Sequence, residues 1–306
     1  MHLNKIILIF IFVIFILLPV NSKSEARIIT DQLGREITVP DNPQRIISLA
    51  PNITEIIFAL GQEQRLKGVT TYSDYPEQAK AYPKVGSYVH LDLEKIVSLK
   101  PDLCIAIKDG NPRSVITRLE KLNIPVYAVD PRNLEAIIET VLEIGILLNT
   151  EQHAKTLTKD MCLRIKRVAE RIKKTDHKPK VFFQIGISPL VSVGTNTFIH
   201  ELIILAGGQN LAQGKTAYPR FGKEQILSLL PEVFIISSMT NTESIDHLKD
   251  QWSKYPQIPA IKNNRMYHVD SNIFDRPTPR LVDALELLAK LIHPEVYENK
   301  SPKVNQ

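Results

Sequence analysis

A stretch that reads as a helix, a proline and a buried strand occurs twice in this chain. The first copy is LEKIVSLKPDLCIAI (residues 93–107), and the second is KEQILSLLPEVFIIS (residues 223–237). Each copy carries an acidic residue at the same place near its start, Glu94 in the first and Glu224 in the second. A helix followed by a continuous apolar strand is typical of a sheet that helices cover on both faces. The duplication therefore predicts two lobes of similar construction within one chain.

The length and the charge limit what else the chain can be. With 306 residues and 43% hydrophobic content, it can bury two cores of medium size, one in each lobe. Its 38 Lys and Arg residues are scattered among 33 Asp and Glu residues, which leaves a small formal charge of +5. The sequence contains no basic stripe of the kind that follows a phosphate backbone, so we predict no nucleic-acid partner.

The N-terminal segment differs in kind from the rest. Lys5 precedes an uninterrupted apolar run at residues 6–18, and small residues follow it. The run is shorter than the roughly 20 residues that a membrane-spanning helix needs, and the layout is that of a secretory signal peptide. We predict a signal peptide at 1–26, with cleavage after Ser22 or Ala26. No cysteine near these points could carry a lipid, so we expect a soluble protein in the periplasm.

Strands and helices alternate on both sides of a purely helical segment. Before it, RIISLA (45–50) reads as a strand, and PNITEIIFALG reads as a helix with Asn52 as its cap and Glu55 as the capping-box partner. After it, KVFFQIG (180–186) and RMYHVD (265–270) read as strands. We predict an α/β fold with two similar lobes, each a mostly parallel sheet flanked by helices. The predicted boundaries are an N-terminal lobe at 27–132, a helical connector at 133–178 and a C-terminal lobe at 179–306.

The connector is predicted to contain one long helix. Residues 151–174 include no proline or glycine. A helix of about 25 residues is about 40 Å long, which is enough to reach from one lobe to the other. We expect this single rigid helix to join the lobes and to keep closure around a ligand small.

Five segments carry a resemblance to a known family. In order, they are RIISLAPNITEIIFALG, GVTTYSDYP, LDLEKIVSLKPDLCIA, VFFQIGISPL and GKEQILSLLPEVFIIS. Together they resemble the cobalamin-binding periplasmic proteins of ABC importers, within the wider group of siderophore, haem and corrinoid receptors with a helical backbone. The resemblance covers nearly the whole chain after the signal peptide, and its most specific element is the TYSDYP turn. It implies a monomer that captures cobalamin or a related corrinoid, with no catalytic activity and no cofactor.

The resemblance also implies a partner. In that family, acidic residues at the places of Glu94 and Glu224 dock onto arginines of the two transmembrane permease subunits of an ABC transporter. Two carboxylates at a fixed separation form a two-point contact, and bidentate bonds from arginine give orientation as well as attraction. One glutamate on each lobe would then serve each half of a symmetric permease dimer.

Polar and aromatic residues on the loops after the strands are the candidate ligand contacts. Open parallel sheets bind ligands beyond the carboxyl ends of their strands, so the cleft between the lobes is the expected site. Aromatic faces would stack on a flat macrocycle, and Arg or Asn would bond its polar rim. The candidates are Tyr72, Tyr75, Tyr88 and Asn111 in the first lobe, and Tyr218, Asn272, Phe274 and Arg276 in the second.

The pocket positions depart from the family pattern and leave the ligand open. Positions that resemble tryptophan sites in the cobalamin binders hold Tyr88, Ile107 and Tyr218, and an acidic site holds Asn272. The alternative ligands are haem or a ferric siderophore, and Tyr88 is the candidate iron ligand if haem is bound. Neither the particular corrinoid nor its affinity follows from the sequence.

Other chemistries have less support in the sequence. His90, His200 and His268 could hold zinc only by converging in space, because no HxH or HExxH pattern is present. We therefore predict no metal site of the protein's own. The chain has no glycine-rich phosphate loop and no nucleophile elbow, so a chelate-modifying enzyme or a metal-dependent hydrolase is disfavoured against a binding protein. Cys104 and Cys162 are predicted to be buried free thiols, although their spacing also allows a disulfide.

Overall fold

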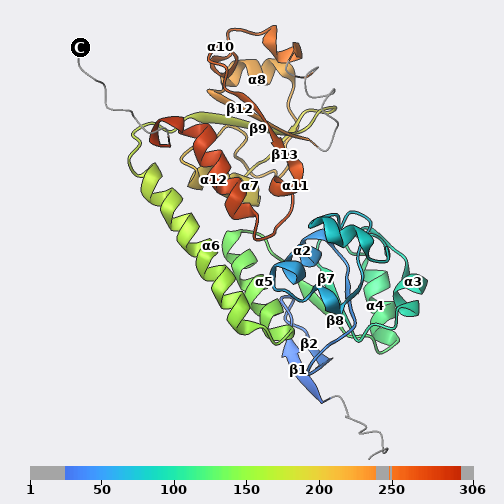
Figure 1. Ribbon diagram of the computed structural model, residues 1–306. Coiled ribbons are helices and arrows are strands. Elements are labelled where there is room, and N and C mark those ends of the chain that lie inside the picture. The colour runs from blue at the N-terminus through green and yellow to red at the C-terminus, as the bar shows by residue number, and fades with distance from the viewer. Residues whose placement is uncertain (1–24, 239–247, 249, 298–306) are drawn as a thin grey trace, which may run out of the picture.

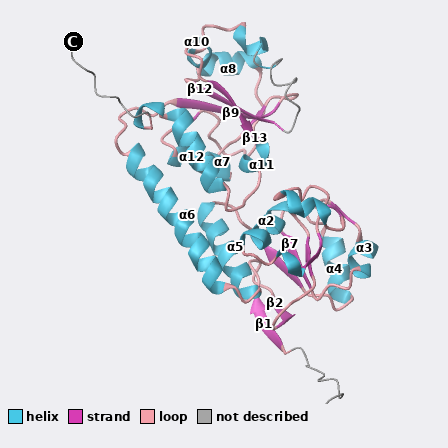
Figure 2. Cartoon of the chain, viewed as in Figure 1, coloured by secondary structure: helices cyan, strands magenta, loops and turns pink. Residues whose placement is uncertain are grey.

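The computed structural model describes residues 25–238, 248 and 250–297 (Figure 1). Two lobes lie at opposite ends of a long helical connector, which runs along one side of the molecule (Figures 1 and 2). The predicted signal peptide lies outside the described residues except for its last two positions. Within the described residues, no helix combines the length and the apolar character that crossing a bilayer would require.

The N-terminal lobe is built on a four-stranded sheet in the order β4-β3-β7-β8. All three pairings in this sheet are parallel. Alternate residues of β7 pack on opposite faces, because Ile105 joins the core under α2 and α5 while Cys104 joins the core under α3 and α4. The elements are β3 (Ile46–Ser48), α2 (Pro51–Ala59), β4 (Leu66–Gly68), α3 (Leu93–Ser98), β7 (Leu103–Ile107), α4 (Arg113–Lys121) and β8 (Val126–Val129).

The C-terminal lobe repeats this plan with a sheet in the order β10-β9-β12-β13, in which β11 also pairs with β9. Every pairing is parallel except the one between β9 and β10. The elements are β9 (Lys180–Gly186), β10 (Val191–Ser192), α7 (Phe198–Leu205), β11 (Gln209–Asn210), α8 (Lys223–Leu229), β12 (Val233–Ser238), α10 (Pro259–Lys262), β13 (Met266–Asp270), α11 (Ser271–Phe274) and α12 (Leu281–Ile292). The predicted α/β architecture of two similar lobes is confirmed.

The duplicated sequence is a duplicated structure. α3 leads into β7 and α8 leads into β12, as the pattern predicts. The residue before the proline is left-handed in both copies, with φ of 49° at Lys100 and 48° at Leu230. A serine in the last turn of each helix also repeats its contact, since Ser98 Oγ and Ser228 Oγ each donate to the carbonyl three residues earlier. The two copies therefore share the left-handed residue that turns the chain from the helix toward the proline and the strand.

The predicted long helix joins the lobes, and a second helix packs along it. α6 (Glu151–Ile172) is the predicted long helix, and α5 (Leu134–Leu147) lies beside it. Both contribute to both cores: Leu134 and Ile137 at the start of α5 pack in the C-terminal lobe, whereas Ile144 packs in the N-terminal lobe. The connector is thus packed against each lobe, which explains why it can hold them apart. The boundaries at 132 and 178 remain a proposal.

Several short elements were not predicted from the sequence. Two hairpins occur in the N-terminal lobe, β1 (Ala26–Thr30) with β2 (Glu36–Pro40), and β5 (Gly86–Ser87) with β6 (His90–Leu91). Short runs such as these carry too few residues to show a period. The remaining short elements are the 3-10 helices Glu63–Arg65, Glu77–Ala81 and Pro294–Val296.

The predicted cap of α2 is wrong. The helix begins after Ala50, and no side chain caps it. Asn52 is buried inside the first turn, and Glu55 points away from the helix start to arginines of the other lobe. The Asn-x-x-Glu spacing is that of a capping box, but a stronger charged partner takes the carboxylate.

Candidate functional site

Exposed tyrosines gather on the loops that follow the strands of both lobes. The chain has nine tyrosines, all in the described residues, and four of them are exposed. Tyr72 and Tyr75 lie in the turn after β4, Tyr88 lies at the tip of the β5–β6 hairpin, and Tyr218 precedes α8. All four belong to the set predicted from the sequence. An exposed aromatic ring is costly to hydrate, so these four rings, three on one lobe and one on the other, remain the candidates for ligand contact.

Buried hydroxyls fix the TYSDYP turn against the start of α2. Thr54 Oγ1 lies 2.8 Å from Ser48 Oγ and 3.0 Å from Ser73 Oγ. Ser73 Oγ in turn lies 2.9 Å from Thr70 Oγ1. The four side chains are almost completely inaccessible to solvent. Since each hydroxyl finds a partner inside the core, this network holds the turn that presents Tyr72 and Tyr75.

Tyr88 is held by its neighbours rather than by its own hydroxyl. Asn111 Nδ2 donates to the carbonyl oxygens of Tyr88 and Leu49, and Asn111 Oδ1 accepts from the Ile107 N–H. The ring lies directly over Gly110, where an added Cβ would come within 2.6 Å of Tyr88 Cδ2. Asn111 is therefore a supporting residue, with its amide already occupied, and Gly110 leaves the space that the ring needs.

In the C-terminal lobe, the prediction for Phe274 does not hold. Its side chain is completely buried and packs against Phe183, with ring centroids 5.6 Å apart. No face of this ring is open to a ligand, because α11 turns it into the core. Asn272, two residues earlier, is half-buried. The side chain that caps α11 is that of Asp270, which accepts from the Asn272 N–H. Sequence periodicity could not separate the two positions within a helix of four residues.

Arg276 is engaged by the other lobe and is not free for a ligand rim. Its Nη1 donates to Glu55 Oε1 at 3.1 Å and to Asp74 Oδ1 at 2.7 Å. Arg280 forms a bidentate pair with Glu55, with both distances 2.8 Å. The guanidinium carbon of Arg280 also lies 3.6 Å from the centre of the Tyr75 ring. We call Glu55, Asp74, Arg276 and Arg280 the inter-lobe ion cluster.

Asp275, beside this cluster, is a carboxyl in a poorly solvated place. Burial raises the pKa of Asp275 from 3.8 to about 6, although the hydrogen bond from Ser237 and the charge of Arg276 act in the other direction. Because Asp275 ionises at a higher pH in the folded protein than in the unfolded chain, its ionisation favours the unfolded chain. The contribution of Asp275 to the free energy of unfolding is therefore fully present below the unfolded pKa and is lost as the pH rises through about 6.

We expect Asp275→Asn, which is uncharged throughout, to stabilise the protein at pH 8 by up to about 3 kcal/mol. Because wild-type Asp275 takes up its proton on acidification, the difference should shrink toward pH 4.5. Urea unfolding of both proteins at the two pH values measures it. An equal difference at both would show that the charge of Asp275 is not the cause.

Glu94 and Glu224 occupy equivalent places on the two lobes. Each lies in the first turn of its helix, α3 or α8, and each side chain is exposed. Within the described residues, neither carboxylate takes part in an ion pair. Each follows an exposed tyrosine by six residues, since Tyr88 precedes Glu94 and Tyr218 precedes Glu224. The placement leaves both carboxylates open to an external cation.

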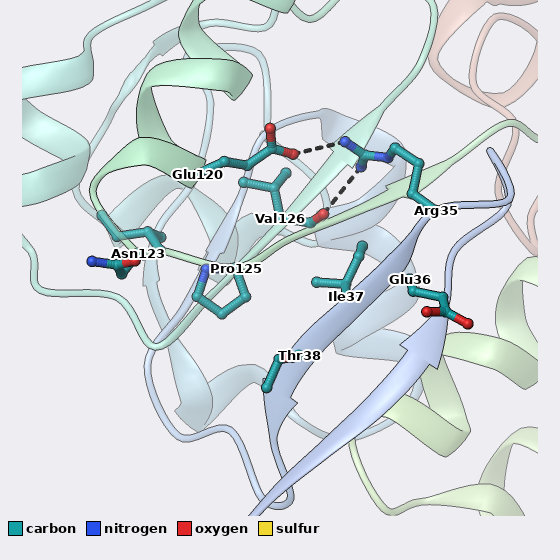
Figure 3. A pocket seen from close by; sticks show the side chains of 9 residues that line it. Arg35, Glu36, Ile37, Thr38, Glu120, Asn123, Pro125 and Val126 are labelled. Atoms are coloured by element: carbon teal, nitrogen blue, oxygen red, sulfur yellow. Dashed lines mark hydrogen bonds and ion pairs between the residues drawn. The ribbon is translucent and has the colours of Figure 1, made fainter.

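A hollow of about 560 Å³ occurs elsewhere on the N-terminal lobe (Figure 3). It lies between β2 and the segment that enters β8, at the end of the sheet opposite the tyrosine loops. Its cation, Arg35, is bound to Glu120 at 2.7 Å and to Asp31. The guanidinium of Arg35 is therefore already paired, and the other charged residues of the lining, Glu36 and Glu120, are acidic, so the lining presents no free cation to a ligand. Its lining residues are Arg35–Thr38, Glu120 and Asn123–Val126.

The metal and thiol expectations can be compared with the described residues. There, no group of three or more His, Cys, Asp or Glu side chains could hold a metal ion. Cys104 and Cys162 are both free, but only Cys104 is buried. Cys162 lies on an outward face of α6, so the prediction of a second buried thiol is wrong.

Comparisons with known proteins give a consistent result. The periplasmic binding protein family matches residues 46–273. The vitamin B12-binding protein of Vibrio campbellii is 32% identical over 243 residues, which cover 79% of this chain and 86% of the relative. An uncharacterized ABC transporter substrate-binding lipoprotein, YvrC of Bacillus subtilis, is 30% identical over 276 residues, covering 88% of this chain and 86% of the relative. A periplasmic haem-binding protein from Pseudomonas aeruginosa superposes with a TM-score of 0.74 at 28% identity, over 82% of this chain and 93% of that one.

Proposed function

The chain belongs to the periplasmic binding protein family, and on that premise we propose that it captures cobalamin or a related corrinoid between its lobes and delivers it to an ABC transporter. The observation that carries the proposal is the set of four exposed tyrosines, two on the turn after β4, one at the β5–β6 tip and one before α8. A corrinoid is a wide ring with a polar rim. Aromatic faces from two lobes suit such a ring better than they suit a small ion.

We propose specific roles for the predicted residues. Tyr72 and Tyr88 would contact one side of the ring, and Tyr218 would contact the other. Tyr75, whose ring lies against Arg280, would form the edge of the site nearest the inter-lobe ion cluster. Asn272 is the remaining polar candidate for the rim. Asn111 would affect ligand binding by positioning Tyr88, and Arg276 by binding Glu55 and Asp74.

The partner would be a permease dimer in the membrane. Substrate-binding proteins of ABC transporters act with such permeases, and YvrC is named as one of them. Exposure of Glu94 and Glu224 at equivalent places supports docking by one carboxylate on each lobe. The family is periplasmic, and we propose that this chain reaches that compartment through a cleaved signal peptide at 1–26 and works there as a monomer.

Haem is the second candidate ligand. A phenol hydroxyl is a suitable axial ligand for ferric iron, and Tyr88 presents one at the tip of a hairpin. The haem-binding protein from Pseudomonas aeruginosa has the same fold, so the architecture admits either ring. A ferric siderophore fits the same aromatic surface without using an axial ligand.

A titration separates the three ligands. We expect cobalamin to release or absorb heat in isothermal calorimetry with a stoichiometry of one, and haem and a ferric siderophore to give none. Protein purified from its native periplasm should show the visible absorption of a corrinoid. Heat from haem, or a Soret band in the purified protein, would replace the corrinoid with haem in this proposal. Recovery of the ligand unchanged after denaturation would exclude an enzyme that modifies it.

A further inference from the structure

The inter-lobe ion cluster joins residues more than 200 positions apart in the sequence. Glu55 and Asp74 belong to the N-terminal lobe, and Arg276 and Arg280 belong to the C-terminal lobe. The Glu55 side chain is 3% exposed, that of Arg276 11% and that of Arg280 15%. Two carboxylates face two guanidinium groups, so the charge of the cluster is balanced.

We propose that this cluster sets the distance and angle between the lobes, and that Glu55 is the positioning residue at its centre. The helical connector fixes the lobes along one side only (Figure 1). A body attached along one side can still pivot about that attachment. The ion cluster supplies the second attachment, at the ends of the sheets where the tyrosine loops lie. With both in place, the spacing between the loops of the two lobes is fixed.

The geometry of Glu55 favours a positioning role over a stabilising one. Buried ion pairs often contribute little net stability, because desolvation offsets their attraction. They do fix geometry, since a bidentate carboxylate and guanidinium pair is satisfied in one plane and at one distance. Glu55 binds both arginines at once, with Oε1 shared between them and Oε2 taken by Arg280.

The cluster also contacts the candidate ligand turn. Asp74 and Tyr75 are neighbours in TYSDYP, and they bind Arg276 and Arg280 respectively. The hydroxyl network fixes the same turn to α2, which carries Glu55. Turn, helix and C-terminal lobe therefore form one connected unit. The part of the inference that concerns affinity for cobalamin rests on the proposed function. The part that concerns the spacing of the lobes does not.

The test measures the distance between the lobes without a ligand. Spin labels at Lys95→Cys and Lys223→Cys, both exposed, report it by pulsed EPR in a Cys162→Ser background, where the remaining thiol, Cys104, is buried. We expect a narrow distribution for the wild type and one about twice as broad for Glu55→Gln, because the neutral amide cannot hold both arginines. The matched control is Asp31→Asn, which removes an equally buried acid paired with Arg35 inside one lobe.

Three results would overturn the inference that Glu55 positions the lobes. A Glu55→Gln distribution as narrow as the wild type would show that the connector alone positions the lobes. If Glu55→Gln does not fold, Asp74→Asn, at a half-exposed carboxylate, must broaden the distribution in the same direction, and an unchanged width there would also overturn the inference. Broadening by Asp31→Asn would show a general loss of packing instead.

Cobalamin then separates this inference from the proposed function. The wild-type distance should change little on loading, and Glu55→Gln should bind cobalamin about tenfold more weakly because fewer molecules hold the competent spacing. Unchanged affinity in a broadened Glu55→Gln would refute the link between the spacing of the lobes and the affinity for cobalamin. Absence of cobalamin binding by the wild type would refute the proposed ligand and leave the lobe measurement valid.

Discussion

Replacing Glu94 and Glu224 together by Ala is expected to abolish transport of the ligand and to leave ligand affinity unchanged. Both carboxylates are exposed in the first turns of equivalent helices, and neither is paired within the described residues. Removing one partner of a desolvated interface pair costs about 2 to 5 kcal/mol, and two such losses exceed what a transient complex can bear. The measurement is uptake of labelled cobalamin by cells that carry the cognate transporter, together with calorimetry of the purified variant.

The single variants and one matched control test the docking prediction further. Each single variant should retain part of the activity, since one docking point remains. Glu151→Ala is the matched control, because Glu151 is also an exposed acid in a first helical turn, on α6. If the double variant binds cobalamin more weakly, the two residues belong to the ligand site and not to the docking surface. Unimpaired uptake by the double variant would exclude docking through these carboxylates.

Replacing Tyr88 by Ala is expected to weaken cobalamin binding at least about tenfold. Stacking contributes about 0.5 to 1.5 kcal/mol beyond area burial, and the contact area lost with the ring adds to this. Tyr88→Trp should be tolerated or should bind more tightly, because the larger ring keeps the face. Calorimetry is the suitable assay, since Trp252 is 2% exposed and packs in the core of the C-terminal lobe, where its fluorescence reports little of the ligand.

Two further variants make the Tyr88 result specific. Gly110→Ala keeps the ring but places a methyl group where the ring lies, so it should displace Tyr88 and weaken binding in the same direction. Leu122→Ala removes an exposed apolar side chain of similar size on the same lobe, after α4, and should change nothing. Equal affinity of Tyr88→Ala and the wild type would remove the hairpin tip from the site.

The strands and long helices of this protein could be predicted because their patterns are local. KVFFQIG corresponds to β9 with the same bounds, and the run without proline or glycine corresponds to α6 to within two residues at its end. The duplicated segment predicted both lobes before any contact was known. The exposed tyrosines could also be predicted from the sequence, because aromatic residues in turns seldom serve core packing. Local order and local exposure are properties that neighbouring residues in the sequence specify.

The tertiary structure decided which of the loop residues are free. Phe274 and Asn272 lie in the same short helix, yet one is completely buried and the other half-buried. Arg276 and Glu55 each had a plausible local role, as a ligand contact and as a capping-box partner, and each is bound to the other instead. The physical reason is distance along the chain: the free energy of such a pair depends on a partner more than 200 residues away, whose approach only the packing of two lobes on one connector determines.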